Sequence, residues 1–162
     1  FKRDKYFDNH STISEATLYT ALSLKLNKDD IIVQLMPNCP LRTIENIFNI
    51  YNFFKNLNDH DSVISCFKFG WMNPWWALKK EGKNFEQLFK NKYNERSQDL
   101  ENLYCPTGSI WITKLGTLVN RNSFYTNKHT FFEIPFDTAI DIDDEDDLKI
   151  SKVFYKMKKE NM

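Results

Sequence analysis

The chain has 162 residues, which is enough for one domain with a sizeable core. Hydrophobic residues make up 41% of the chain and aromatic residues 15%, a content that excludes an intrinsically disordered protein. Lys plus Arg and Asp plus Glu both number 22, so the net charge is zero and neither a nucleic acid nor an anionic membrane is expected as a partner.

The first half of the chain alternates between helix and strand patterns. Candidate N-cap serines from residue 11, followed by apolar residues at helical spacing, predict a helix to about residue 24. The apolar, β-branched run 30–36 predicts a buried, parallel strand. Two prolines make 37–42 a rigid turn before a helix over 43–57. The run 61–67 is the next strand, which completes a βαβ unit with a right-handed crossover.

The alternation breaks down between residues 68 and 104 and then resumes. Three tryptophans fall within six residues of this segment, and 84–94 predicts a short polar helix. A strand at 108–113, a short helix at 114–119, a strand at 131–134 and a final helix follow. With no repeat or linker, the whole chain is predicted to be one α/β domain with a layered sheet.

Two of the predicted helices carry apolar stripes that are expected to face the core. The stripe of the helix over 43–57 consists of Ile44, Ile47, Phe48, Tyr51, Phe54 and Leu57. The stripe of the final helix consists of Leu148, Val153, Phe154 and Met157.

The cysteines and the lack of a membrane-spanning run in the sequence indicate the cellular compartment of the protein. Cys39, Cys66 and Cys105 are odd in number and widely spaced, which predicts free, buried thiols in a reducing compartment. No apolar run approaches the roughly 20 residues that span a bilayer, and no signal peptide is visible. A soluble, cytoplasmic protein is expected. The chain begins with Phe1 and contains no glycine-rich phosphate loop, so an N-terminally truncated sequence is also expected.

The acidic run 138–148 combines a candidate metal site with a helix start. Asp141 and Asp143 are one residue apart, so their side chains share a face of an extended segment. Two such carboxylates, completed by phosphate oxygens and waters, suit Mg²⁺. The acids at 144–147 favour the positive end of a helix dipole. The alternative interpretation is helix capping by Asp143 or Asp144 without a metal.

Three segments resemble motifs of the acylneuraminate cytidylyltransferase (CMP-sialic acid synthetase) family. Residues 37–42, Pro-Asn-Cys-Pro-Leu-Arg, are similar to the family's Pro-Thr-Ser-Pro-Leu-Arg turn. Residues 106–112, Pro-Thr-Gly-Ser-Ile-Trp-Ile, resemble its Pro-Asn-Gly-Ala-Ile-Tyr-Ile strand, and residues 139–148 resemble its Ser-Ile-Asp-Ile-Asp-Thr-Glu-x-Asp-Leu segment. The shared order and spacing extend the resemblance over essentially the whole chain. The family's N-terminal part, with its triphosphate-binding loop, is missing.

The resemblance implies a fold and a reaction. The fold is a Rossmann-like nucleotidyltransferase three-layer sandwich with a mostly parallel sheet, formed by a single domain over 1–162. Residues 68–104 are an excursion that dimerises the protein and contributes to the substrate pocket. In the implied reaction, a sialic-acid-like nonulosonic acid of neuraminic, legionaminic or pseudaminic type attacks CTP with the help of Mg²⁺, which yields CMP-sugar and pyrophosphate. The alternatives are a cytidylyltransferase for an octulosonate-type sugar and a non-catalytic, dimerising fragment.

The resemblance also assigns roles to individual residues. Asp141 and Asp143 match the catalytic, metal-binding acids. Substrate contacts are expected from Ser14, Gln34, Met36, Asn38, Arg42, Trp76, Gly108, Phe124 and Tyr125.

Several of these assignments depart from the family pattern. Met36 stands where the family has a glutamine, and a thioether cannot replace the hydrogen bonds of an amide. Gln34, two residues earlier on the same strand face, could compensate. Cys105 and Trp76 stand where a basic substrate contact is typical. These departures concern the identity of the sugar more than the reaction type.

Other assignments have structural alternatives. Ser14 is equally suited to be a helix N-cap. Arg42 could balance the charge of an anion, but a structural role in a helix N-terminus or a salt bridge is the favoured interpretation. For Phe124 and Tyr125, which match an aromatic pair that reaches into a neighbouring subunit, the alternative is packing in the core or in an interface. The tryptophans at 71, 75 and 76 could line the sugar pocket or an interface between subunits, and the interface is the preferred interpretation.

Overall fold

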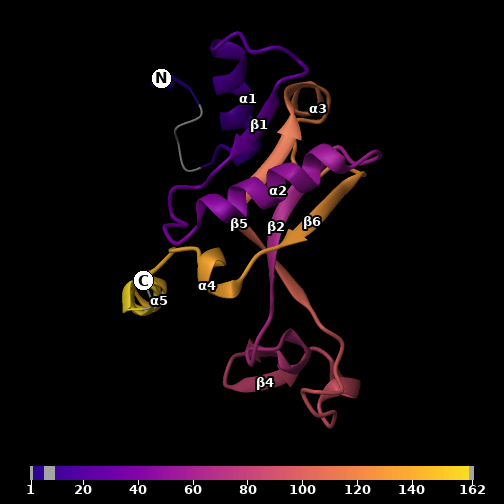
Figure 1. Ribbon diagram of the computed structural model, residues 1–162. Helices are drawn as coiled ribbons and strands as arrows, with labels where there is room; N and C mark the ends of the chain where they lie inside the picture. Colours follow the sequence, from indigo (N-terminus) through magenta and orange to yellow (C-terminus); the bar gives the residue numbers. More distant parts are fainter. Residues whose placement is uncertain (1, 6–9, 161–162) are drawn as a thin grey trace.

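A four-stranded sheet in the order β1-β5-β2-β6 forms the centre of the described structure. This computed structural model describes residues 2–5 and 10–160 (Figure 1). The strands are β1 (Ile31–Gln34), β2 (Ser62–Lys68), β5 (Tyr104–Lys114) and β6 (His129–Glu133). β2 pairs in parallel with β6, whereas β5 lies antiparallel between β1 and β2.

The directions of the strands agree only in part with the predicted parallel sheet. β1, β2 and β6 share one direction, but the insertion of β5 makes two of the three pairings antiparallel. β1 was expected to be a buried parallel strand. It pairs antiparallel with β5 and all four of its residues are half-buried, because it is the terminal strand of this sheet. An apolar, β-branched run indicates a strand but carries no information about its direction.

Helix α2 (Ile44–Asn56) covers one face of the sheet. Thr43 begins it with a capping box, since its hydroxyl oxygen accepts from the Asn46 backbone N–H at 3.1 Å. Ile50 and Phe54 pack on this face against β2 and β5. Ile44 and Phe48 of the predicted stripe are exposed instead. The buried line runs through positions 46, 50 and 54, so the helix is rotated relative to the predicted stripe.

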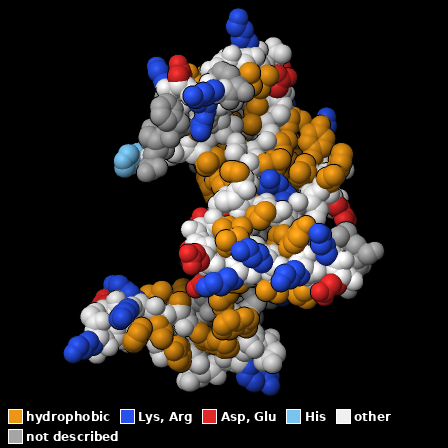
Figure 2. Space-filling view, turned by 90° about the vertical axis from the view of Figure 1, so that its left-hand side faces the viewer, with side chains coloured by type: hydrophobic (Ala, Val, Ile, Leu, Met, Phe, Trp, Pro, Cys, Tyr) orange, Lys and Arg blue, Asp and Glu red, His pale blue; other side chains and the backbone are white. Residues whose placement is uncertain are grey.

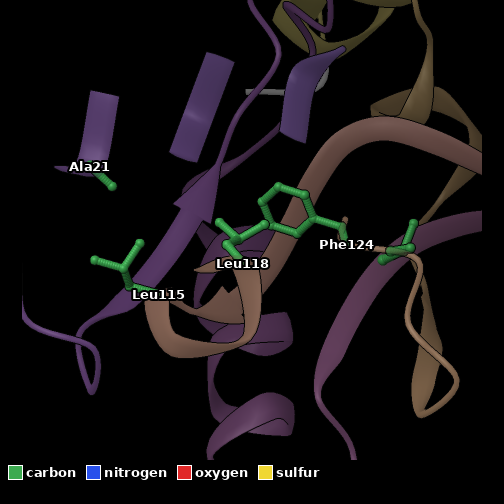
Figure 3. Packing of buried hydrophobic residues seen from close by; sticks show 5 residues of the cluster. Ala21, Leu115, Leu118 and Phe124 are labelled. Atoms are coloured by element: carbon green, nitrogen blue, oxygen red, sulfur yellow. The ribbon is translucent and has the colours of Figure 1, made fainter. Parts of the chain in front are cut away.

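Helices α1 (Ile13–Ser23) and α3 (Leu115–Arg121) cover the other face and complete the predicted three layers (Figure 1). Ala21 of α1 and Leu115 and Leu118 of α3 form a core with Ile64 of β2 and with Phe124, which is fully buried (Figure 3). Burying each such large apolar side chain stabilises the fold by about 2 kcal/mol.

Two further helices follow β6 and carry the acidic run between them. Phe136 of α4 (Phe136–Ala139) contacts Phe154 of α5 (Glu145–Glu160), with ring centroids 5.9 Å apart. The prediction that Leu148, Val153 and Met157 lie on the inner face of α5 is wrong, because all three side chains are exposed. Figure 2 shows hydrophobic side chains between the lysines on this side of the molecule. A helical apolar period does not reveal whether the same chain supplies the covering surface.

The excursion (residues 68–104) projects from the sheet where β2 and β5 continue past it (Figure 1). It contains a hairpin of β3 (Leu78–Glu81) and β4 (Asn84–Gln87), flanked by the short helices η1 (Pro74–Trp76) and η2 (Lys90–Lys92). The helix predicted over 84–94 is therefore wrong. Gly82, with φ of +61°, forms the hairpin turn, a conformation that glycine adopts without strain.

The tryptophans of the excursion divide into two kinds. The indole N–H of Trp75 donates to the Glu101 carbonyl at 3.0 Å, and that of Trp76 donates to the Lys92 carbonyl at 3.3 Å. These two side chains therefore hold the excursion together. Trp71 is 85% exposed. Hydrophobic side chains gather on the lower part of the molecule, where the excursion lies (Figure 2).

Across residues 2–5 and 10–160, no helix has the length and apolar character needed to cross a membrane.

Candidate metal and substrate site

The two-proline turn after β1 is fastened to β5. The backbone N–H of Cys39 donates to the Met36 carbonyl at 3.4 Å and closes the turn. The guanidinium Nη1 of Arg42 donates to the carbonyl oxygens of Met36, at 3.1 Å, and Ser109, at 2.6 Å. Arg42 therefore joins the segment after β1 to the middle of β5. This contact favours a structural role, although one of a different kind from the helix terminus or salt bridge considered from the sequence.

Gly108 allows a close approach between β5 and the residue before the turn. The Met36 N–H donates to the Gly108 carbonyl at 3.4 Å, and the Met36 side chain lies over Gly108. A Cβ atom at position 108 would lie 2.2 Å from Met36 Sδ, a distance that real contacts do not show. The absence of a side chain at Gly108 thus makes room for Met36.

The acidic loop (residues 140–144), between α4 and α5, lies against the same turn. The Thr107 hydroxyl donates to the Ala139 carbonyl at 2.8 Å and holds the start of the loop on β5. The Ile142 N–H donates to the Asn38 carbonyl at 2.9 Å. All three motif segments are therefore in direct contact, although Asn38 and Ile142 are 104 residues apart in the chain.

Side-chain contacts place both acids of the pair at the turn. Asn38 Nδ2 lies 3.4 Å from Asp143 Oδ1, and Cys39 Sγ lies 3.7 Å from Asp141 Oδ1. Asp141 is half-buried and Asp143 is exposed. Asn38 and Cys39 thus each contact one carboxylate of the predicted metal pair.

The other acids begin α5, as predicted. Asp144 Oδ1 accepts from the N–H groups of Asp146, at 2.8 Å, and Asp147, at 3.0 Å. In return, Asp147 Oδ2 accepts from the N–H groups of Asp143, at 3.1 Å, and Asp144, at 3.2 Å. The capping alternative therefore describes Asp144. Asp141 remains available for a ligand, and so does the side chain of Asp143.

The electrostatics of the pair favour a cation. Burial, and then the charge of Asp143, raise the pKa of Asp141 above its usual value, and the hydrogen bond from Cys39 opposes this shift. Burial and the nearby Asp141 raise the pKa of Cys39 to about 12. The Cys39 thiol therefore stays protonated at neutral pH, where it donates a hydrogen bond and does not offer a thiolate to a metal.

The donor set fits Mg²⁺. Within the described part of the chain, no group of three or more His, Cys, Asp or Glu side chains is arranged to hold a metal ion. The pair thus supplies two carboxylates and leaves the other positions to waters or substrate oxygens, which is the usual arrangement for Mg²⁺.

A cavity of about 580 Å³ lies between α1 and β1 and reaches the turn at Pro37. Gln34 lines it, and Gln34 Oε1 accepts from the Thr17 hydroxyl at 2.7 Å, so this amide faces α1. Pro37 lines the same cavity next to Asn38. Ser14 is buried within α1 and is not its N-cap, because Thr12 caps the helix.

The remaining predicted substrate residues lie elsewhere. Phe124 is 0% exposed in the core beneath α3, which agrees with the packing alternative. Tyr125 is partly exposed, and its ring lies edge-on to those of Trp111 and His129. Trp76 lies in the excursion.

Thr107 and the contacts of Cys39 were missed at the sequence level. Thr107 is buried within a motif segment, where it was read only as strand. The sequence signal for Cys39 was its position beside Asn38 in the turn, but a contact with Asp141 requires the fold.

The three-layer α/β fold with an acidic pair after its last strand is compatible with a nucleotidyltransferase. Among curated proteins, the chain is similar to N-acylneuraminate cytidylyltransferases of Streptococcus agalactiae. It is 27% identical to that of a serotype V strain and 26% identical to those of serotypes III and Ia, in each case over 147 residues.

These relatives confirm the resemblance that the three motifs indicated. The alignments cover 80% of this chain and 34% of each relative, so the chain spans about a third of the length of the curated relatives it matches. No family model matches the chain.

Proposed function

We propose that the protein is a cytidylyltransferase that activates a sialic-acid-like nonulosonic acid with CTP, which gives CMP-sugar and pyrophosphate. The observation that carries this proposal is the contact between the two-proline turn and the acidic loop, with Asn38 beside Asp143 and Cys39 beside Asp141. The similarity to cytidylyltransferases supports the reaction class.

Asp141 and Asp143 are the residues that would hold Mg²⁺. When bound, the ion would neutralise charge on the triphosphate, which is the main requirement of phosphoryl-type transfer. The protein's contribution is to bring two negative charges together and to keep them in place. Burial and then the charge of Asp143 raise the pKa of Asp141, so keeping this carboxylate ionised costs free energy without a cation.

The cavity between α1 and β1 is the proposed place for part of the substrates. Its volume of about 580 Å³ lies within the roughly 300–1,000 Å³ that is usual for small-molecule sites. Arg3, Thr17 and Thr20 line it, together with Gln34. A guanidinium, hydroxyls and an amide suit a ligand with phosphate, carboxylate and hydroxyl groups.

The excursion is the proposed dimerisation element. Exposed apolar patches of this kind mark interaction sites in soluble proteins. The exposed apolar residues of the excursion include Trp71, Met72, Leu78, Phe85, Leu88 and Phe89. The internal hydrogen bonds of Trp75 and Trp76 hold the excursion in one conformation, which lowers the entropic cost of binding a second copy.

We also place the reaction in the cytoplasm. Cys39, Cys66 and Cys105 are free thiols, and such cysteines are usual where the compartment is reducing.

Pyrophosphate release tests the function directly. The product of the whole natural gene is incubated with CTP, Mg²⁺ and a panel of neuraminic, legionaminic, pseudaminic and octulosonic acids. Release with a nonulosonic acid is expected. Release with the octulosonic acid alone would assign the alternative sugar class, and no release with any sugar would overturn the proposal.

A pair of variants tests the residues. Asp143→Asn should lower turnover more than about 100-fold, because it removes a metal-holding carboxylate. Asp146→Asn is the matched control, since Asp146 is an exposed acid that pairs with Lys149 on α5. Equal turnover in the two variants would remove Asp143 from the site.

A further inference from the structure

Side chains of the two-proline turn contact only one oxygen of each carboxylate in the acidic pair. Each side chain of the turn reaches the same kind of atom: Asn38 Nδ2 lies 3.4 Å from Asp143 Oδ1, and Cys39 Sγ lies 3.7 Å from Asp141 Oδ1. Between them, the Ile142 N–H donates to the Asn38 carbonyl at 2.9 Å. Three consecutive residues of the acidic loop are thus held by two consecutive residues of the turn.

The donors are linked to each other. Cys39 Sγ also lies 4.0 Å from Asn38 Oδ1, so the amide and the thiol belong to one small network. Cys39 is 1% exposed and cannot turn toward solvent. Arg42 fastens the far end of the turn to the Met36 and Ser109 carbonyls. Arg42 therefore anchors the turn that carries Asn38 and Cys39 to the sheet.

A hydrogen bond to one oxygen limits how a carboxylate can bind a metal. With Oδ1 accepting a hydrogen bond, the carboxylate offers Oδ2 freely to a cation, whereas binding through both oxygens makes the cation share Oδ1 with the donor, which weakens both contacts. Ca²⁺ takes six to eight oxygen ligands and readily uses carboxylates through both oxygens, whereas Mg²⁺ takes six ligands and usually binds a carboxylate through one. The same contacts thus disfavour one ion and not the other.

We infer that Asn38 and Cys39 are positioning residues that hold Asp141 and Asp143 each by one oxygen and thereby make the pair discriminate against Ca²⁺ in favour of Mg²⁺. This inference rests on the proposed function, because it takes the pair to be a metal site. It adds what the acids alone do not supply, namely a selectivity set by two residues that do not bind the ion.

Direct metal titration tests the inference without any turnover. Mn²⁺ alone is the probe: the paramagnetic resonance signal of free Mn²⁺ falls as it binds, and Mg²⁺ or Ca²⁺ then displaces it. The measured quantity is the ratio of the Ca²⁺ and Mg²⁺ dissociation constants. Loss of one hydrogen bond to a carboxylate should shift this ratio toward Ca²⁺ by about fivefold in Cys39→Ala and in Asn38→Ala.

Three controls sharpen the test. Cys39→Ser keeps a donor at the same position and should keep the ratio. Cys66→Ala removes another buried free thiol, which lies on β2, and should leave the ratio unchanged. Asn38 is only half-buried, so Asn38→Ala decides the question if Cys39→Ala does not fold, as judged by its melting transition.

The outcomes separate this inference from the proposed function. If Mn²⁺ binds and Asp143→Asn abolishes binding, but Asn38→Ala and Cys39→Ala leave the ion ratio unchanged, the positioning role is overturned and the metal site stands. If the wild-type protein binds no Mn²⁺, or if Asp143→Asn binds it equally well, the metal site and the inference fall together.

Discussion

Gly108 is the position where one added methyl group tests the contact between the turn and β5. In Gly108→Ala, the new Cβ would lie 2.2 Å from Met36 Sδ, whereas ordinary contacts begin at 3.4 Å. The sulfur must therefore retreat by about 1.2 Å. The Cε and Cγ atoms of Met36 also lie only 3.2 Å from the added atom, so the whole side chain must move. Overpacking of this kind costs about 1–3 kcal/mol.

The free energy of unfolding, measured by urea denaturation, gives the size of this effect. For a protein of this length, the same cost lowers the melting temperature by about 3–10 °C. Gly70→Ala is the matched control, because no atom lies within 4 Å of its added Cβ and its φ is not positive. It should change the stability by less than about 0.5 kcal/mol.

A double variant identifies the clashing partner. Met36→Ala removes the sulfur, so adding Gly108→Ala to it should cost much less than adding Gly108→Ala to the wild-type protein. The coupling free energy between the two positions should exceed about 0.5 kcal/mol. Additive effects, or a Gly108→Ala variant as stable as Gly70→Ala, would refute the close approach.

Three other predictions concern Asp141, Arg42 and Trp71. Because the pKa of Asp141 is raised in the folded protein, the ionised form of this side chain destabilises the metal-free fold. The penalty is absent below the pKa of the unfolded chain, about 3.9, and grows as the pH rises through the folded pKa. Asp141→Asn should therefore raise the melting temperature in EDTA at pH 7 and progressively less toward pH 4, and an equal gain at both would contradict the cause. Arg42→Met should cost about 1–2 kcal/mol in urea denaturation, because it removes Nη1, the one donor that reaches both the Met36 and the Ser109 carbonyl; an unchanged midpoint would argue against that bridge. Trp71→Ser should leave the monomer as stable as before but weaken self-association more than tenfold in sedimentation equilibrium, and unaltered association would exclude this surface as the interface.

The elements of the fold were largely predictable because apolar periodicity is a local property. The strand that precedes Pro37, the helix begun by Thr43 and the final helix begun by the acidic run were all predictable from short stretches. The pairing of β1 with β5 was not, because it joins segments about 80 residues apart and depends on what lies beside each strand. The hairpin at Gly82 was missed because polar strands lack the alternation that marks strands packed on a core.

The burial of apolar side chains on helices was also not predictable from a local pattern. Phe48 and Val153 were assigned to inner faces from their spacing, and both are exposed. Spacing defines which residues of a helix share a side. It contains no information about which surface, if any, of the same chain lies opposite that side.

The candidate site was predictable in its acids but not in its contacts. The spacing of Asp141 and Asp143 and the order of the motifs marked the pair, and Cys39 was expected to be a buried free thiol, as it is. That its sulfur faces Asp141 follows only from the fold, since 102 residues separate them. Gln34 was expected beside Met36, whereas its bond to Thr17 turns the amide toward α1.

The way in which the excursion is attached has a mechanical consequence. β2 and β5 remain paired beyond the last residue that pairs with β6, through Phe67 with Cys105 and Lys68 with Tyr104, so two paired strands carry the excursion in place of two single linkers. Such a ribbon resists bending more than a loop does. At its base the register with β5 is irregular between Ile64 and Cys66, where the Ser65 hydroxyl donates to the Thr107 carbonyl at 3.1 Å and accepts from the Ile110 N–H at 2.9 Å. A load applied to the tip of the excursion should therefore be transmitted to the sheet beside Thr107 and the acidic loop.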